Sequence, residues 1–161
     1  MCESYDVCKE MSDAEVVKLA TRVLDQVDEF GETILTVMVR TGRLQLCKKL
    51  LDIGLSPDYS IGGGDSMSLC IEWNYDCACE MLALLLPYSK FGISDQHSWG
   101  STLLHSAVCE GRLDVAKWLI DRGASMKDMD IDGDKVMDMP MSAKLRDELL
   151  TYEFGERGEG G

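Results

Sequence analysis

The sequence predicts an all-α fold of short helices stacked in pairs, and three observations lead to this prediction. Residues 31-GETILTVMVRTGRLQLCKKLLDIGLS-56 align without a gap with residues 100-GSTLLHSAVCEGRLDVAKWLIDRGAS-125, so the chain contains a repeat. Apolar residues within each segment recur at the i, i+3, i+4 spacing of one helix face. A glycine separates two such apolar stretches in each segment, and helices this short can bury their apolar faces only against neighbouring pairs.

Glycines at three equivalent positions set the register of the repeat. The equivalent pairs are Gly31 and Gly100, Gly42 and Gly111, and Gly54 and Gly123. The offset of 100 − 31 = 69 residues is about twice 33 residues, the length of a known helical repeat, so a middle unit is expected between the two segments. We expect Gly42 and Gly111 to permit a sharp reversal between the two helices of their units. We expect Gly54 and Gly123 to end the second helix in a left-handed conformation.

Residues 64–87 form the expected middle unit, although their similarity to the other two is weaker. The 37 residues from Gly63 to Gly100 exceed the repeat length of about 33 by four, and we expect the extra residues in 86-LPYSKFGISDQH-97. Gly133 follows 33 residues after Gly100, so a truncated fourth unit is expected to begin there.

Both ends of the chain have the features of polar caps on a stack. Ser12 and Glu15 have the spacing of a capping box, which predicts a helix over 13–27. Ser142 is expected to cap a last helix, and the Gly- and charge-rich tail at 153–161 is expected to be disordered. In the last helix we expect to find Leu145, Leu149 and Leu150 facing inward and Lys144, Arg146, Asp147 and Glu148 facing water.

The repeated segments resemble the ankyrin repeat. Residues 102-TLLHSA-107 stand for the family motif T-P-L-H-x-A and depart from it only at Leu103, and Gly123-Ala124 matches the Gly-Ala that closes the second helix. The resemblance extends from about Asp28 to Leu150. It implies an ankyrin-repeat solenoid of stacked helix-turn-helix units with extended β-hairpin fingers. It also implies that His105 orders backbone hydrogen bonds between neighbouring units.

This resemblance gives an expected organisation along the chain. We expect an N-terminal segment and capping helix at 1–30, a first ankyrin repeat at 31–63, a divergent second repeat at 64–99, a third repeat at 100–132, a truncated C-terminal capping repeat at 133–152 and a disordered tail at 153–161.

Composition and charge narrow the possible classes of partner. The net charge is −13, from 29 acidic and 16 basic residues, and such a surface repels nucleic-acid backbones and favours basic partners. The chain has no apolar run long enough to span a membrane, and its first residues lack the pattern of a signal peptide. We therefore expect a monomeric cytoplasmic or nuclear protein with reduced thiols, bound to neither membrane nor nucleic acid.

The stretch 128-DMDIDGDKVMDM-139 resembles the start of a calcium-binding loop. Aspartates fill its first, third, fifth and seventh positions and a glycine fills the sixth, but the twelfth position, which needs a bidentate glutamate, is Met139. The resemblance to ankyrin repeats instead places Asp130 to Gly133 in a finger between two units. No metal ligand set is therefore predicted, and a calcium-responsive protein using Asp128 to Asp134 remains an alternative hypothesis.

The seven cysteines and the glycine-rich segment do not indicate an enzyme. Cys77 and Cys79 lack the two-residue gap of a zinc knuckle, and residues 62–64 lack the Gly-Lys-Ser/Thr of a phosphate loop. We therefore predict no catalytic residue, no metal and no cofactor. A redox sensor that uses Cys2 and Cys8, on an N-terminus expected to be mobile, remains a second alternative.

Surface recognition is the remaining function, because in ankyrin-like stacks the fingers and the first helices line a groove. Projected onto this chain, the partner-binding residues are Glu29, Phe30, Glu32, Arg40, Glu72, Trp73, Ser98, Trp99, Ser101, Glu110, Ile131, Asp132 and Asp134. Exposed large aromatic residues often dominate the energy of an interface, which favours the three aromatic residues in this set. The sequence therefore predicts an interaction module, acting as an adaptor or stoichiometric inhibitor, that binds a basic or Lys/Arg-bearing protein segment.

Overall fold

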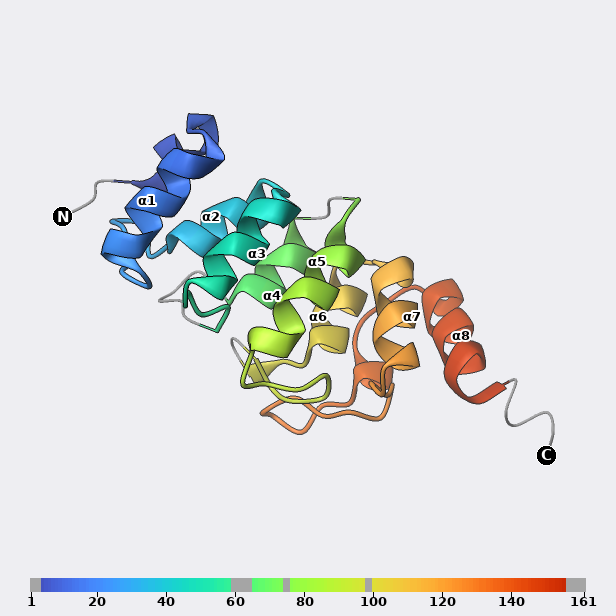
Figure 1. Ribbon diagram of the computed structural model, residues 1–161. Helices are drawn as coiled ribbons and strands as arrows, with labels where there is room; N and C mark the ends of the chain where they lie inside the picture. Colours follow the sequence, from blue (N-terminus) through green and yellow to red (C-terminus); the bar gives the residue numbers. More distant parts are fainter. Residues whose placement is uncertain (1–3, 59–64, 74–75, 98–99, 156–161) are drawn as a thin grey trace. The chain divides into compact units, whose positions relative to one another are not determined.

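The computed structural model describes residues 4–58, 65–73, 76–97 and 100–155 (Figure 1). Regular structure in these residues is helical, and the only β pairing among them is an isolated antiparallel bridge between Met129 and Lys135. The described residues of the expected fingers form turns rather than strands. No helix in these residues is both long enough and apolar enough to cross a membrane. The chain divides into two compact units, Met1–Lys90 and Phe91–Gly161.

The first unit contains three stacked helix pairs. Its elements are the 3-10 helix η1 (Tyr5–Glu10), α1 (Asp13–Val23), α2 (Ile34–Arg40), α3 (Leu44–Asp52), α4 (Ser66–Glu72), α5 (Ala78–Leu85) and the short 3-10 helix η2 (Leu86–Tyr88). The first helix of each pair packs on the next, as η1 on α2 and α2 on α4, and the second helices α1, α3 and α5 pack in the same order. The segment before α1 thus takes the place of a first helix, and the middle unit is a regular pair.

The predicted capping box of α1 is confirmed, but the predicted end of this helix is wrong. The Ser12 side chain accepts from the backbone N–H of Glu15, and the Glu15 carboxylate accepts from the backbone N–H and the hydroxyl of Ser12. The helix ends at Val23 rather than at residue 27, and Leu24 takes a φ of 48°. The next residue, Asp25, accepts a hydrogen bond of 2.8 Å from the backbone N–H of Ser56, which holds it to the loop after α3. The chain just beyond the helix is thus held by a residue 31 positions away.

The conformation of Leu24 predicts a stabilising substitution. A positive φ costs an L-residue roughly 1–2 kcal/mol, whereas glycine adopts it freely at a smaller entropic cost in the unfolded chain. We expect Leu24→Gly to raise the free energy of unfolding by about 0.5–1 kcal/mol, measured by urea denaturation. Leu24→Ala removes the same half-exposed side chain but keeps a Cβ, so it is expected to be neutral or destabilising. Equal changes in the free energy of unfolding for Leu24→Gly and Leu24→Ala would contradict the inference that the Leu24 backbone is strained.

The second unit contains one regular helix pair and one pair with a shortened first helix. Its elements are α6 (Leu103–Cys109), α7 (Leu113–Asp121), the 3-10 helix η4 (Val136–Asp138), α8 (Ala143–Leu150) and one π-helical turn, η5 (Thr151–Gly155). Helix α7 packs on α6 and α8, and η4 packs on α6. Its outermost pair, like that of the first unit, has a 3-10 segment in place of the first α-helix.

The last helix follows the prediction in part. The Ser142 side chain caps α8 by accepting from the backbone N–H of Leu145, and Leu149 is fully buried. Lys144 and Asp147 are exposed as expected, whereas Leu145, Glu148 and Leu150 are partly buried. Arg146 was expected to face water, but its guanidinium donates to the carbonyls of Met137 and Met139 at 3.0 and 2.9 Å. It thereby ties α8 to the segment that precedes it.

The tail was expected to be disordered from residue 153, and this is wrong for residues 153–155. Glu153 is buried and accepts a hydrogen bond of 2.6 Å from the backbone N–H of Met126. The Tyr152 hydroxyl donates to Asp121 at 2.5 Å, and the Tyr88 hydroxyl donates to Asp52 at the same distance in the first unit. The sequence carries a signal for this order, because 149-LLTYEFG-155 repeats most of 85-LLPYSKFG-92. Residues 156–161 lie outside the described part of the chain.

The extra length of the middle unit lies only in part where it was expected. The two N-caps of a helix pair are ten residues apart in α2–α3 and in α6–α7 but twelve apart in α4–α5, and they are Thr33 and Arg43, Thr102 and Arg112, and Asp65 and Cys77. Two of the four extra residues therefore belong to the turn between α4 and α5, and not to residues 86–97.

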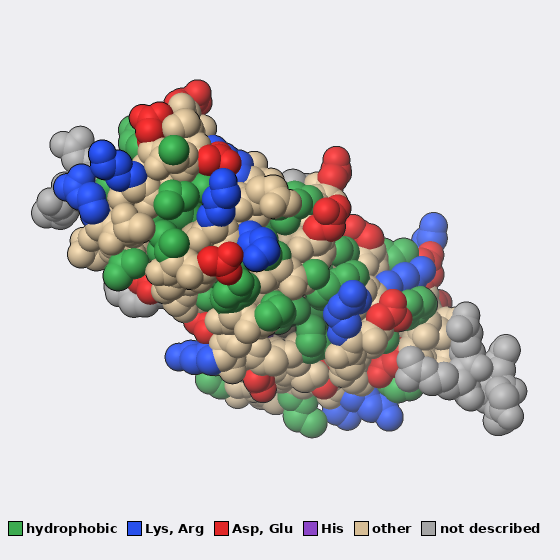
Figure 2. Space-filling view, in the orientation of Figure 1, with side chains coloured by type: hydrophobic (Ala, Val, Ile, Leu, Met, Phe, Trp, Pro, Cys, Tyr) green, Lys and Arg blue, Asp and Glu red, His purple; other side chains and the backbone are tan. Residues whose placement is uncertain are grey.

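Each unit has its own apolar core, formed where the inner faces of the paired helices meet. Side chains with no exposed surface include Leu35, Leu50, Met67 and Leu82 in the first unit and Leu104, Val115, Leu119 and Leu149 in the second. On the face that α1, α3 and α5 form, Figure 2 shows charged side chains interspersed among hydrophobic ones. The packing of the buried apolar side chains fixes the positions of the turns between the helix pairs, where the candidate sites lie.

Candidate protein-interaction surfaces

A single carboxylate shapes the finger turn of the first unit. Asp28 Oδ1 accepts from the backbone N–H groups of Phe30 and Glu32 at 2.9 and 3.0 Å, and Asp28 Oδ2 accepts from the backbone N–H of Tyr5 at 2.8 Å. Gly31 completes the turn with a φ of 78°. The turn leaves the Phe30 side chain 66% exposed at its tip, next to the exposed Glu29.

The second unit builds the same turn around Asp130. Asp130 Oδ1 accepts from the backbone N–H groups of Asp132 and Asp134, both at 2.9 Å, and Gly133 has a φ of 87°. Asp132 thus occupies the tip position that Phe30 occupies in the first unit. This geometry agrees with the expected finger between two units.

A third turn of this kind contains His97 in place of the aspartate. The His97 backbone N–H donates to the carbonyl of Ser101 at 2.7 Å, as the equivalent aspartates do in their turns. Its ring contacts the carbonyl of Gly92 at 3.2 Å and packs on Phe91 with 5.1 Å between centroids. The ring therefore holds the preceding loop. Two predicted contact residues of this turn, Ser98 and Trp99, lie outside the described residues.

The predicted contact residues of the first unit, here called the first-unit surface, are Glu29, Phe30, Glu32, Arg40, Glu72 and Trp73. Three of them come together at Arg40, whose guanidinium forms a bidentate pair with Glu32 at 3.1 and 2.9 Å. The same guanidinium lies over the Trp73 indole at 5.2 Å from the ring centroid. Trp73 remains 52% exposed. The structure thus links the end of α2 to the end of α4.

The sequence did not indicate Asp6 as a fourth member of this cluster. Arg40 Nη2 lies 2.9 Å from Asp6 Oδ1, and Lys9 Nζ lies 2.8 Å from the same oxygen. Hydrogen bonds from Lys9 and Arg40 hold the pKa of Asp6 below its ordinary value. The charges of Glu32 and Asp6 are therefore matched by cations of this chain. No pattern in the sequence pairs Asp6 with Arg40, which lies 34 positions later.

The predicted contact residues of the second unit that the structure describes, here called the second-unit surface, are Ser101, Glu110, Ile131, Asp132 and Asp134. Ile131 is 69% exposed, and its neighbour Met129 is 51% exposed. The Ile131 backbone N–H donates to the carbonyl of Gly100 at 2.8 Å. The side chains of Asp132 and Asp134 are exposed, and neither forms an ion pair with another described residue.

The predicted role of His105 is confirmed. Its Nδ1 lies 2.7 Å from the Thr102 hydroxyl, and its Nε2 lies 2.9 Å from the carbonyl oxygen of Asp134. The ring is 1% exposed. Because a carbonyl only accepts, Nε2 carries the proton and Nδ1 accepts from Thr102. His105 thereby connects the start of α6 to the following finger turn.

The aspartates of the acidic loop support turns. Asp128 Oδ2 accepts from the backbone N–H of Ser125 at 3.0 Å and from the Ser94 hydroxyl at 2.9 Å, and Asp130 Oδ1 binds two backbone N–H groups. In the described part of the chain, no three His, Cys, Asp or Glu side chains are grouped so as to hold a metal ion. The loop thus follows the finger interpretation.

The expectation of a mobile Cys8 is wrong. Cys8, Cys47 and Cys70 have no exposed surface, and burial raises the pKa of the Cys47 thiol well above its ordinary value. Buried thiols in apolar surroundings are chemically inert, because the thiolate is the reactive form. Cys109 is exposed, and Cys2 lies outside the described residues.

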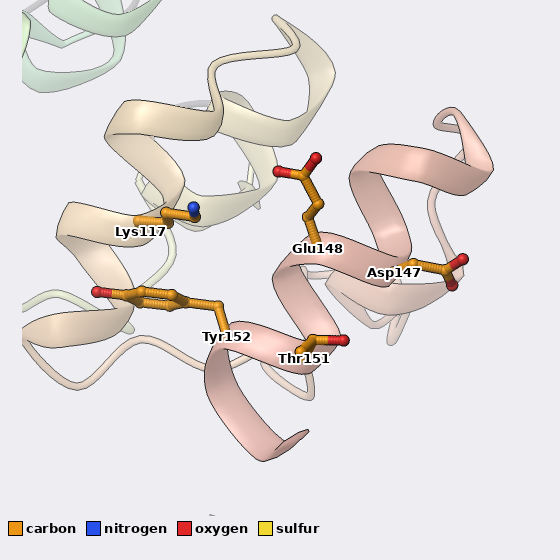
Figure 3. A pocket seen from close by; sticks show the side chains of 5 residues that line it. All are labelled: Lys117, Asp147, Glu148, Thr151 and Tyr152. Carbon is orange, nitrogen blue, oxygen red and sulfur yellow. The ribbon is translucent and has the colours of Figure 1, made fainter. Parts of the chain in front are cut away.

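A shallow hollow of about 430 Å³ in the second unit lies between α7 and α8 (Figure 3). Its lining consists of Lys117, Asp147, Glu148, Thr151 and Tyr152, and Lys117 Nζ lies 5.2 Å from the centre of the Tyr152 ring. Asp147 points away from the ring in this view, so the lining does not converge on a point where a substrate atom could react.

Comparison with known proteins identifies the fold. Residues 99–131 match the family model described as ankyrin repeat. The ankyrin repeat domain of Bcl-3, described as a unique member of the IkappaB protein family, has a TM-score of 0.67 at 22% identity over 86% of this chain and 64% of that chain. The human ASB11 ankyrin repeat domain has a TM-score of 0.57 at 24% identity over 76% of this chain and 54% of that chain.

A search of curated protein sequences found no match. The chain spans less than two thirds of the length of either solved domain. These similarities establish the ankyrin-repeat fold, and the fold class and the family resemblance predicted from the sequence are confirmed.

Proposed function

We propose that this ankyrin-repeat chain is a protein–protein interaction module that binds a basic partner through the first-unit surface and the second-unit surface. The fold supports an interaction module, because stacked repeats present extended surfaces built from equivalent positions of successive units. Within this function we propose an adaptor or a stoichiometric inhibitor, because the residues that line the hollow between α7 and α8 do not form a catalytic arrangement.

The observation that carries this proposal is the location of the exposed large apolar side chains. Among the described residues, five large apolar side chains are more than half exposed: Val7, Phe30, Trp73, Met129 and Ile131. Val7 lies in η1, and the other four lie in finger turns or at the end of a first helix. Large side chains that are exposed on a fixed backbone are the usual anchors of a protein interface. The surfaces chosen by repeat register therefore hold three of these five side chains, Phe30, Trp73 and Ile131.

The charge of the partner follows from which carboxylates are already paired. Glu32 is matched by Arg40, so the first-unit surface offers little free negative charge at that point. Asp132 and Asp134 lie exposed beside Ile131. Free carboxylates around an apolar anchor favour a partner with Lys or Arg around an apolar pocket, and they speed its association.

The buried cysteines support the expected compartment. Cys8, Cys47 and Cys70 are thiols in the core, which suits a reducing environment. We therefore propose a cytoplasmic or nuclear location and a monomeric state for this chain.

A binding experiment with matched controls tests the proposal. The wild-type protein is used to isolate a partner, and the dissociation constant of the purified pair is then measured for surface variants. We expect Phe30→Ser, Ile131→Ser and Asp132→Lys each to weaken binding by at least about tenfold, as anchor residues do. Asp132→Lys should also reduce the dependence of the association rate on salt.

The control variants change exposed residues elsewhere. Leu24→Ser removes an apolar side chain after a second helix, and Asp147→Lys reverses a charge on α8. Both are expected to bind within about twofold of wild type, since rim and remote substitutions contribute little. Circular dichroism establishes that each variant is folded. Unchanged binding by every folded surface variant, or equal loss in the controls, would refute the proposed surfaces.

A further inference from the structure

The Arg40 guanidinium is held in place from three directions. Glu32 accepts from its Nε and Nη2 atoms, Asp6 accepts from Nη2, and the Trp73 indole covers its face at 5.2 Å. Only 12% of the Arg40 side chain is exposed. A planar guanidinium bound at its edge by two carboxylates and at its face by an indole has lost its freedom to rotate. The indole therefore rests on a fixed support.

This arrangement decides what the first-unit surface can offer a partner. The donor atoms Nε and Nη2 of Arg40 are occupied by carboxylates of this chain, so Arg40 does not serve as an anchor for an acidic partner. Trp73 is 52% exposed, so a large part of the indole remains open to a partner side chain. A fixed aromatic face binds with less loss of side-chain entropy than a mobile one.

We propose that Asp6 and Glu32 position Trp73 for the partner through Arg40, so that helix η1 belongs to the recognition surface of the first unit. This inference rests on the proposed function, and it adds a positioning role for residues outside the predicted contact set. The partner it fits places an apolar or arginine side chain flat against the indole, the two kinds of group that stack on tryptophan.

The N-terminal segment stays docked when Asp6 is changed, because other contacts hold it. Tyr5 is buried and its backbone N–H binds Asp28. Arg43 donates to the carbonyl of Met11 at 3.2 Å and pairs with Asp13. Substitution of Asp6 therefore removes the contact with Arg40 without removing the helix.

The first measurement reports on Trp73 without any partner. The other two tryptophans are replaced by phenylalanine in the variant Trp99→Phe/Trp118→Phe, and acrylamide quenching of the remaining fluorescence is recorded. We expect Asp6→Asn to raise the quenching constant of Trp73. Arg40→Lys, which keeps the charge but loses the planar fork, should raise it further.

Two controls separate positioning from general loosening. Lys9→Ala removes a cation that binds the same Asp6 oxygen but does not touch Trp73, and Asp13→Ala removes a different ion pair of the N-terminal segment. Both are expected to leave the quenching constant at its wild-type value. An effect of Asp13→Ala equal to that of Asp6→Asn, or no effect of Arg40→Lys, would overturn the inference.

The second measurement is the dissociation constant for the isolated partner. We expect Asp6→Asn to weaken binding about two- to fivefold, the usual range for an exposed ion pair, and Arg40→Lys to weaken it about tenfold. If Trp73→Ala binds like wild type, the inference fails while the proposed function still stands on Phe30→Ser and Ile131→Ser. If no surface variant affects binding, the proposed function fails with it, whatever the quenching shows.

Discussion

Gly100→Ala is expected to lower the free energy of unfolding of the second unit by about 2–5 kcal/mol. Gly100 has a φ of 76°, which costs a residue with a Cβ about 1–2 kcal/mol. A Cβ built at this position would also lie 2.3 Å from Ile131 Cγ2 and 2.6 Å from Ile131 Cβ. Relieving such an overlap requires a shift of the finger turn, at a cost of about 1–3 kcal/mol. Urea denaturation followed by circular dichroism measures the loss.

Gly133→Ala is the matched control, because it separates backbone strain from overlap. Gly133 has a φ of 87°, but an added Cβ would meet nothing within 4 Å. We expect it to cost only the strain, about 1–2 kcal/mol. Replacing Ile131 by glycine in the Gly100→Ala protein should recover the overlap cost, whereas replacing it by alanine should not, since Ile131 Cβ itself is too close. If Gly100→Ala and Gly133→Ala lower the free energy of unfolding equally, the finger turn shifts to relieve the overlap at no free-energy cost.

His105→Ala is expected to destabilise the second unit by about 3–5 kcal/mol. The substitution leaves a cavity where a fully buried ring was, and it removes one of the two hydrogen bonds at the Thr102 hydroxyl and one of the two at the Asp134 carbonyl. Each lost hydrogen bond costs about 0.5–1.5 kcal/mol, in addition to the lost packing. The same urea measurement gives the size of the effect.

Thr102→Val serves as the control for His105→Ala. It removes the cap of α6 and one of the two side-chain contacts of His105, but it leaves the contact with Asp134 in place. Loss of a helix cap costs about 0.5–2 kcal/mol, so Thr102→Val should be the milder variant. If it proves as damaging as His105→Ala, the contact from His105 to the finger turn contributes little.

The parts of the fold that the sequence predicted are those set by local rules. The register of Gly31, Gly100 and Gly133 is confirmed by a positive φ at each of them. The Ser12–Glu15 capping box involves residues three positions apart. Such features depend on a few neighbouring residues, and the sequence displays those residues directly.

The parts that the sequence did not predict depend on contacts between distant residues. Helix α1 ends at Val23, close to the bond between Asp25 and Ser56, and no propensity in residues 13–27 indicates that end. Helix η1 and its C-cap are held by Asp28 and Arg43, which lie 23 and 32 positions from the residues that they bind. The order of residues 153–155 could have been found, because the Leu-Leu-x-Tyr pattern occurs twice.

For the candidate surfaces, too, the sequence predicted what local position decides and missed what distant contacts decide. Repeat register placed Phe30 and Ile131 in finger turns, and both are exposed there. Register also selected Glu32 and Arg40 as partner contacts, but in the structure Arg40 pairs with both Glu32 and Asp6. The position of a residue in the repeat predicts whether its side chain lies on the outside of the stack. Whether its charge is free to bind a partner depends on neighbours that only the folded structure brings together.

The turn around Asp28 also has a consequence for the order in which the first unit folds. Two of its hydrogen bonds join residues two and four positions away, whereas the bond from Tyr5 spans 23 positions. Closing the longer loop costs more chain entropy, so the carboxylate engages its own turn before it receives the N-terminal segment. We therefore expect the finger turn to form before the cap docks on it. We also expect the cap to open before the turn in native-state hydrogen exchange, exposing Tyr5.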